Sequence, residues 1–129
     1  MYSSSVRVLA YQNTNAAVKF STGWGTATDP SFYGGSTRYS NTRAKTASLT
    51  FSGKSIAWLS ALGPTRGSAR VYVDNTLIAT VNLNSATTTA KRVVFARNFS
   101  AVGTHTIRVT VLGTAGHPRV DVDAFLVLR

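Results

Sequence analysis

The chain has 129 residues, and its 14 Lys and Arg against four Asp and no Glu give it a net charge of +10. This length suits one domain with its own core, and a hydrophobic fraction of 43% argues against a disordered chain. No apolar run approaches the roughly 20 residues that cross a bilayer, and there is no cysteine for disulfides or thiolate metal sites.

Apolar and polar residues alternate with a period of two along most of the chain, which predicts half-buried β-strands rather than helices. Residues 1–17 are expected to form a less regular strand or a linker remnant, and the only helical turn is expected near 29–33. Asp74-Asn75 separates two strand patterns as a hairpin turn would, since Asn tolerates positive φ. The clearest strand patterns, in chain order, are 47–51, 56–62, 69–73, 77–83, 93–95, 105–112 and 120–128.

About eight or nine short strands, with turn signals every eight to twelve residues or so, predict an antiparallel β-sandwich or jelly roll. We expect a single all-β domain over residues 1–129, because no repeat, linker or composition shift divides the chain. The alternation places Ile107, Val109 and Val111 on the inner face of their strand, and Trp58 is expected in the core.

Three groups of residues resemble a known family more closely than the strand pattern alone does. They are Ser21-Thr22-Gly23-Trp24 with Phe32-Tyr33-Gly34-Gly35, Trp58 through Gly63-Pro64-Thr65-Arg66-Gly67 to Asp74, and Gly103-Thr104-His105 with Val120-Asp121-Val122-Asp123. In this order, over residues 18–128, they resemble the galactose-binding-like, carbohydrate-binding-module-type accessory domains of secreted bacterial hydrolases and surface proteins. The resemblance implies a non-catalytic jelly-roll module that holds an enzyme or a cell at a polymer.

The same resemblance implies one candidate metal site. Related jelly rolls often hold a structural calcium ion with an Asp of the last strand, which by position is Asp123. Calcium takes roughly six to eight oxygen ligands, whereas residues 1–28 contain no acid, so the carboxylates make a poor cage. A structural calcium at Asp123 is therefore retained only as an expectation from the resemblance, and no other cofactor is expected.

The acidic residues are too few for a convincing hydrolase site, so we expect no enzyme. Glycoside hydrolysis requires two carboxylates across the scissile bond. Asp29 and Asp74 are most simply turn residues, and the two Asp of the last strand share one face, where Arg66 or Arg119 would pair with them. The two His are too few for a metal cluster, and no nucleophile motif is present.

Binding has better candidates than catalysis. Sugars present flat apolar faces rimmed by hydroxyl groups, which suit rigid aromatic side chains and the planar donors of Arg. Trp24 also suits the core, and Arg66 also suits a structural ion pair with an Asp of the last strand. The candidate ligand-binding residues are Trp24, Tyr33, Arg38, Tyr39 and Arg66.

A net charge of +10 points to anionic partners, but its distribution argues against nucleic acid. The basic residues are scattered singly, only Lys91 and Arg92 are adjacent, and no nucleic-acid-binding motif is visible. We therefore expect an accessory module that binds polysaccharide, with a preference for acidic glycans, tethered to a larger secreted or cell-surface protein without membrane insertion. The first twenty residues lack the apolar segment of a signal peptide. Two alternatives stay open: an assembly or adhesion domain that contacts protein neighbours, and a general polyanion binder.

Overall fold

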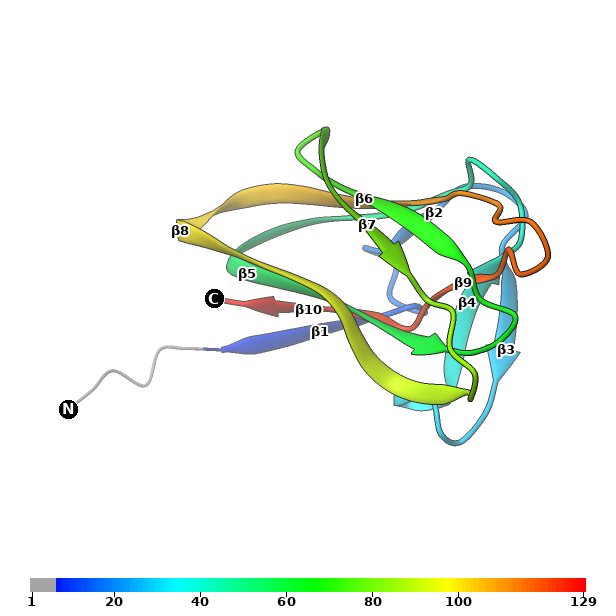
Figure 1. The fold of residues 1–129 in the computed structure, drawn as a ribbon. Helices are drawn as coiled ribbons and strands as arrows, with labels where there is room; N and C mark the ends of the chain where they lie inside the picture. Colours follow the sequence, from blue (N-terminus) through cyan, green and yellow to red (C-terminus); the bar gives the residue numbers. More distant parts are fainter. Residues whose placement is uncertain (1–6) are drawn as a thin grey trace.

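Two antiparallel sheets form the computed structural model of this chain, which describes residues 7–129 (Figure 1). The strands are β1 (Val8–Gln12), β2 (Lys19–Phe20), β3 (Gly25–Thr28), β4 (Ser36–Ser40), β5 (Thr46–Leu62), β6 (Ser68–Val73), β7 (Thr76–Asn82), β8 (Thr89–Val111), β9 (Val120–Val122) and β10 (Ala124–Leu128). The larger sheet has the order β1-β10-β5-β8-β6-β7, with β2 also paired to β5, and the smaller sheet has the order β3-β4-β9. The predicted all-β antiparallel sandwich is thus confirmed.

Two unusually long strands connect the layers of the sandwich. β5 and β8 have 17 and 23 residues, whereas most strands have roughly 3–10. They pair along their length with three register shifts, the first of them just after Gly53, and Figure 1 shows both turning back at one side of the molecule. The larger sheet folds over at this bend, which makes two layers of it. The first half of β5, paired with β2, lies in one layer, and the second half, paired with β10, lies in the other. A side chain at Gly53 would come within 2.6 Å of Val127 Cγ1, which explains the glycine at this bend.

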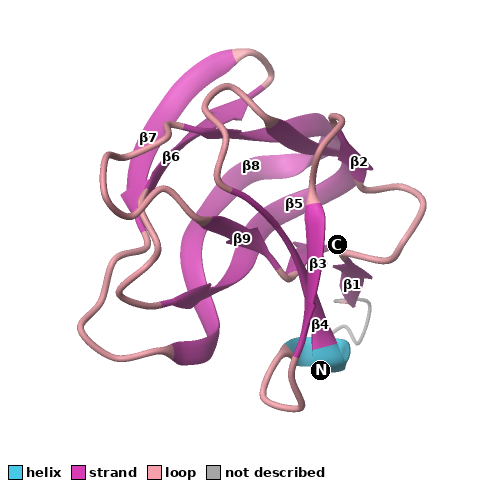
Figure 2. Ribbon diagram, turned by 90° about the vertical axis from the view of Figure 1, so that its right-hand side faces the viewer, coloured by secondary structure: helices cyan, strands magenta, loops and turns pink. Residues whose placement is uncertain are grey.

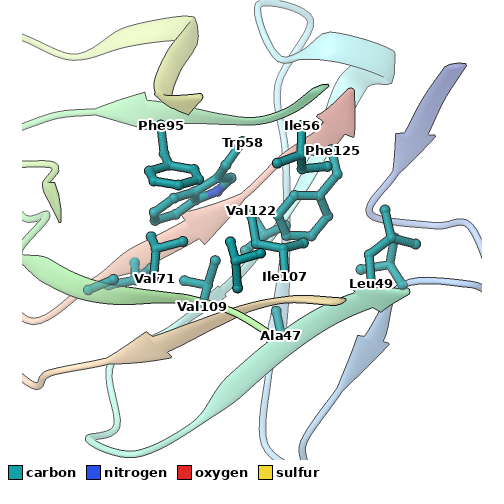
Figure 3. Packing of buried hydrophobic residues seen from close by; sticks show 14 of the residues in the cluster. Ala47, Leu49, Ile56, Trp58, Val71, Phe95, Ile107, Val109, Val122 and Phe125 are labelled. Atoms are coloured by element: carbon teal, nitrogen blue, oxygen red, sulfur yellow. The ribbon is translucent and has the colours of Figure 1, made fainter. Parts of the chain in front are cut away.

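The core lies between the layers and follows the predicted alternation. Ile107, Val109 and Val111 are fully buried on β8, and Trp58 is 0% exposed on β5, as expected. Figure 3 shows Trp58 beside Phe95, with Phe125 and Val122 packed between the layers. Trp24, for which a core position was also considered, is half-buried and packs against this cluster.

The ends of the described chain and its turns complete the fold. Of residues 1–17, numbers 1–6 lie outside the described part, and 8–12 form β1, which pairs with β10 along its length. Asp74 and Asn75 have φ values of 51° and 67°, as the predicted hairpin turn requires. Within residues 7–129 the helical content is a single 3-10 turn, η1 (Tyr33–Gly35), and no helix there is long and apolar enough to span a membrane.

Candidate functional site

Asp121 on β9 of the smaller sheet forms a buried charge cluster with Arg66 and Arg119. Because β9 alternates, Val120 and Val122 face the core while Asp121 faces the other side, and Asp123 follows the strand directly. Arg119 donates from Nε and Nη2 to Asp121 at 2.8 and 3.0 Å, and Arg66 donates from the same two nitrogens at 3.2 and 3.4 Å. The predicted pairing of these arginines with an Asp of the last strand is confirmed for Asp121.

The cluster is electrically unbalanced. Asp121 is 0% exposed, and its carboxylate also accepts a bond from Thr37 Oγ1 at 2.8 Å. Two guanidinium groups against this one carboxylate leave a net charge of +1. Arg66 is buried by the cluster, whereas the side chain of Arg119 remains 23% exposed. The unbalanced positive charge therefore reaches the surface at Arg119.

Arg119 is held against an aromatic ring. Its guanidinium lies 4.4 Å from the centroid of the Tyr39 ring, within the range of a cation–π contact. Tyr39 is paired with Gly25 across β3 and β4, and a side chain at Gly25 would come within 2.8 Å of Tyr39 Cζ. The glycine thus lets the ring lie across β3, and the ion pair with Asp121 fixes the guanidinium above it.

Beside this stacked pair lies a cleft of about 430 Å³. This volume falls within the roughly 300–1,000 Å³ of small-molecule sites. The cleft combines an aromatic ring and a proline ring with amide, hydroxyl and guanidinium groups. Its lining residues are Tyr39, Asn41, Thr65, Gly116, Pro118 and Arg119.

Backbone hydrogen bonds hold the two loops that form much of the cleft, 63–67 and 113–119. Gly67 N–H donates to Arg119 O at 2.9 Å, and Arg119 N–H donates to Thr65 O at 3.1 Å. A side chain at Gly67 would collide with the carbonyl oxygen of His117, so the close approach of the loops requires glycine there. These walls are preformed by the fold rather than assembled around a ligand.

The structure does not bring the five predicted binding residues together. Tyr39 lines the cleft and Arg66 stands behind it, bonded to Asp121. Arg38 precedes Tyr39 on β4 and so points to the opposite face, where its guanidinium lies 5.2 Å from the Phe20 ring. Trp24 contacts the same Phe20 edge-on, with ring centroids 5.1 Å apart.

Tyr33 lies in a third place, at the other end of β4. It begins η1, which Figure 2 shows at the foot of β4, and its backbone N–H donates to Asp123 Oδ2 at 2.9 Å. The other lining residues, Asn41, Thr65, Gly116 and Pro118, were not among the predicted binding residues. The density of Gly and Pro in 63–67 and 113–118 was visible, but nothing local indicated that these two loops meet.

Asp123 is the one buried acid without a cationic hydrogen-bond partner. The pKa of Asp123 is raised to about 6, chiefly by burial and also by the nearby charge of Asp121, although the Tyr33 N–H and Lys91 act to lower it. Its Oδ1 is buried and has no hydrogen-bond partner. No group of three or more His, Cys, Asp or Glu side chains suited to a metal occurs within residues 7–129. One free carboxylate oxygen is a poor match to the roughly six to eight that calcium takes, so calcium at Asp123 stays a prediction.

Comparison with known proteins relates the chain to larger carbohydrate-active enzymes. No protein-family model matches it. It is 33% identical over 111 residues to an A type blood N-acetyl-α-D-galactosamine deacetylase of Flavonifractor plautii, covering 86% of this chain and 14% of the deacetylase. It is 30% identical over 92 residues to an A type blood α-D-galactosamine galactosaminidase of the same organism, covering 71% of this chain and 8% of that enzyme. The chain thus spans a small part of the length of these relatives.

Solved structures extend this likeness to the whole fold. The CBM36-1 domain of a multidomain xylanase from a Trinervitermes trinervoides hindgut metagenome has a TM-score of 0.57 at 14% identity, covering 95% of this chain and 97% of that one. The chain described here therefore has the fold of a carbohydrate-binding module. The same module fold matches 34% of a family two carbohydrate esterase from Cellvibrio japonicus (TM-score 0.67, 12% identity, 95% of this chain). It also matches 28% of the catalytic domain of a GH87 α-1,3-glucanase (TM-score 0.61, 12% identity, 93% of this chain). The resemblance expected from the sequence is confirmed.

Proposed function

We propose that this domain is a non-catalytic glycan-binding module that holds a larger carbohydrate-active enzyme at its substrate, outside the cell or on its surface. The observation that carries the proposal is the cleft, in which the stacked Arg119 and Tyr39 stand beside Pro118 and the polar side chains of Asn41 and Thr65. The small share of each relative that the chain spans also favours an accessory role.

In this proposal a sugar unit enters the cleft with its apolar face against Tyr39 or Pro118. Its hydroxyl groups bond to Asn41, Thr65 and Arg119, whose planar or compact polar groups suit such ligands. Because the hydrogen bonds to Asp121 hold Arg119 in place, ordering this side chain adds little cost to binding. The excess positive charge favours glycans that carry carboxylate or sulfate groups, and this preference weakens with salt.

The placement of the four acids supports a module without hydrolytic activity. Asp121 forms ion pairs with two arginines, and Asp123 is fully buried. Asp29 caps its own turn by accepting bonds from Ser31, and Asp74 accepts a bond from Thr106 N–H at its hairpin. No two carboxylates flank the cleft, which glycoside hydrolysis would require.

The first ligands to test are A-type glycans. The two relatives are named for N-acetyl-α-D-galactosamine and α-D-galactosamine, so we propose that a glycan ending in one of these hexosamines enters the cleft. Acidic polysaccharides form the second group, because of the charge on Arg119.

A glycan array followed by affinity electrophoresis and calorimetry tests the proposal. Asn41→Ala and Thr65→Ala change exposed side chains, so each is expected to weaken binding severalfold without loss of stability. Tyr33→Ala, at the other end of β4, is the matched control and should bind normally. No binding to any glycan would refute the proposal. Equal binding to all polyanions, lost in salt and insensitive to Asn41→Ala, would indicate a general polyanion binder instead.

A further inference from the structure

We infer that the cleft distinguishes hexosamines by the charge on their nitrogen, accepting the N-acetylated sugar and rejecting the protonated free amine. Arg119 is the residue that determines this specificity. The inference rests on the proposed function, because it names the class of glycan that the same cleft takes.

Arg119 places a positive charge at the wall of the cleft. Arg119 is the only ionic side chain among the lining residues, and it is held there by two hydrogen bonds to Asp121. Asp121 gives no compensating negative charge to a ligand, since Arg66 pairs with the same carboxylate. An ammonium group in the cleft therefore meets the fixed positive charge of the Arg119 guanidinium.

No other carboxylate is available to an ammonium group. Asp123 lies between β9 and β10, is fully buried, and does not line the cleft. Asp29 and Asp74 are engaged in their own turns, with Ser31 and with His105 and Thr106. The protonated amine would lose water without gaining a counter-ion, which is costly for any charge.

Arg119, Asn41 and Pro118 at the cleft wall suit an N-acetyl substituent. Its carbonyl oxygen can accept a hydrogen bond from the Arg119 guanidinium or the Asn41 amide, and its methyl group can pack on Pro118. It carries no charge, so Arg119 attracts it rather than repels it. Two unit charges about 4 Å apart repel by an amount that reduces binding at least fivefold, even with the full dielectric screening of water. For a half-buried Arg119 we expect about a tenfold preference for the N-acetylated form.

This selectivity has a consequence for any enzyme that carries the domain. Deacetylation replaces the N–C(O)CH₃ bond with N–H, releases acetate after addition of water, and leaves an amine that is protonated at neutral pH. A module with this preference would stay on unreacted glycan and leave glycan that has been deacetylated. It thus fits an enzyme like the first relative, which is named as a deacetylase, better than one like the second, which is named for the free amine sugar.

The test compares two A-type glycans that differ only in this substituent, N-acetyl-α-D-galactosamine and α-D-galactosamine. Calorimetric titration at about pH 7 is expected to give a tenfold weaker Kd for the free amine. Near pH 9.5, where a sugar amine is largely neutral, the ratio should fall towards one. The N-acetylated glycan, titrated at both pH values, reports any change in the protein itself. Equal affinities at pH 7, or a ratio that pH leaves unchanged, would overturn the inference.

Variants of the protein locate the effect. Arg119→Gln should reduce the ratio severalfold, and Arg119→Lys, which retains the charge, should preserve it. Arg70→Gln removes the same charge from an exposed position on β6 that does not line the cleft, and it should leave the ratio intact. If Arg70→Gln changes the ratio as much as Arg119→Gln, overall charge rather than the cleft is responsible. If neither glycan binds, the proposed A-type ligands fail, and the inference fails with them.

Discussion

The protonation of Asp123 should make this domain more stable in weak acid than at neutral pH. Its carboxyl group is fully buried, Oδ2 accepts one backbone N–H, and Oδ1 has no partner, so burial penalises the ionised form. Burial raises the pKa from 3.8 to about 6, which corresponds to about 3 kcal/mol of stability that is absent above the folded pKa. This stability is regained as the pH falls through 6 towards 3.8, because in that range Asp123 is protonated in the folded state but still ionised in the unfolded state.

Asp123→Asn isolates this contribution, since the amide oxygen can still accept the Tyr33 N–H. Urea unfolding, followed by Trp fluorescence at about pH 5, 6 and 7.5, should show the wild type gaining about 1 kcal/mol relative to the variant between pH 7.5 and 5. Comparison with the variant cancels the other titrating groups, including Asp29 and Asp74, whose pKa values are lowered by hydrogen bonds.

Two results would contradict this reasoning about Asp123. Parallel pH profiles for the wild type and Asp123→Asn would show that the carboxylate is not penalised in the folded state. A rise in stability at neutral pH on adding calcium, absent in the variant, would show instead that Asp123 is an ionised metal ligand. That second result would support the calcium site expected from the sequence.

Three further perturbations test the packing and the charge cluster. Asp121→Asn leaves two guanidinium groups facing a neutral amide and should destabilise the domain by about 3–5 kcal/mol in urea unfolding, whereas exposed Asp29→Asn should change it by less than about 1 kcal/mol. A change below about 1 kcal/mol for Asp121→Asn would mean that Arg66 and Arg119 find other partners. Trp58→Ala should cost about 3–5 kcal/mol because the ring is 0% exposed, and Val93→Ala, on an exposed site, should cost far less; similar losses for both would contradict the core assignment. Gly67→Ala should separate the two cleft loops at the His117 carbonyl, weakening glycan binding together with stability, and normal binding by this variant would show that the loop contact is dispensable.

The alternation of side chains was readable from the sequence because it is a local property. In a strand, successive residues face opposite sides, so Ile107, Val109 and Val111 on β8 had to share one face, and the structure buries all three. The hairpin at Asp74-Asn75 was equally local, since it depends on which residues tolerate positive φ. What the alternation left open was the bend of β5 and β8 that makes each of them part of two layers.

The charge balance of the sequence determined that some acids would be paired with arginine, because four Asp face 14 basic residues. Which arginines pair with which Asp depends on the loops that the fold brings together, and Arg66 reaches Asp121 across 55 positions of sequence.

The five predicted binding residues lie apart in the structure. Arg38 and Tyr39 are neighbours in sequence, but they face opposite sides of β4. The sequence by itself thus determined the clearest strand segments, their inner faces and the scarcity of carboxylates, all of which depend on local pattern or on composition, whereas β2, β3 and β4 carried too weak a pattern to be predicted. Only the tertiary structure placed Tyr39, Thr65 and Arg119 around one cleft, because strand register and loop packing join residues that no local pattern connects.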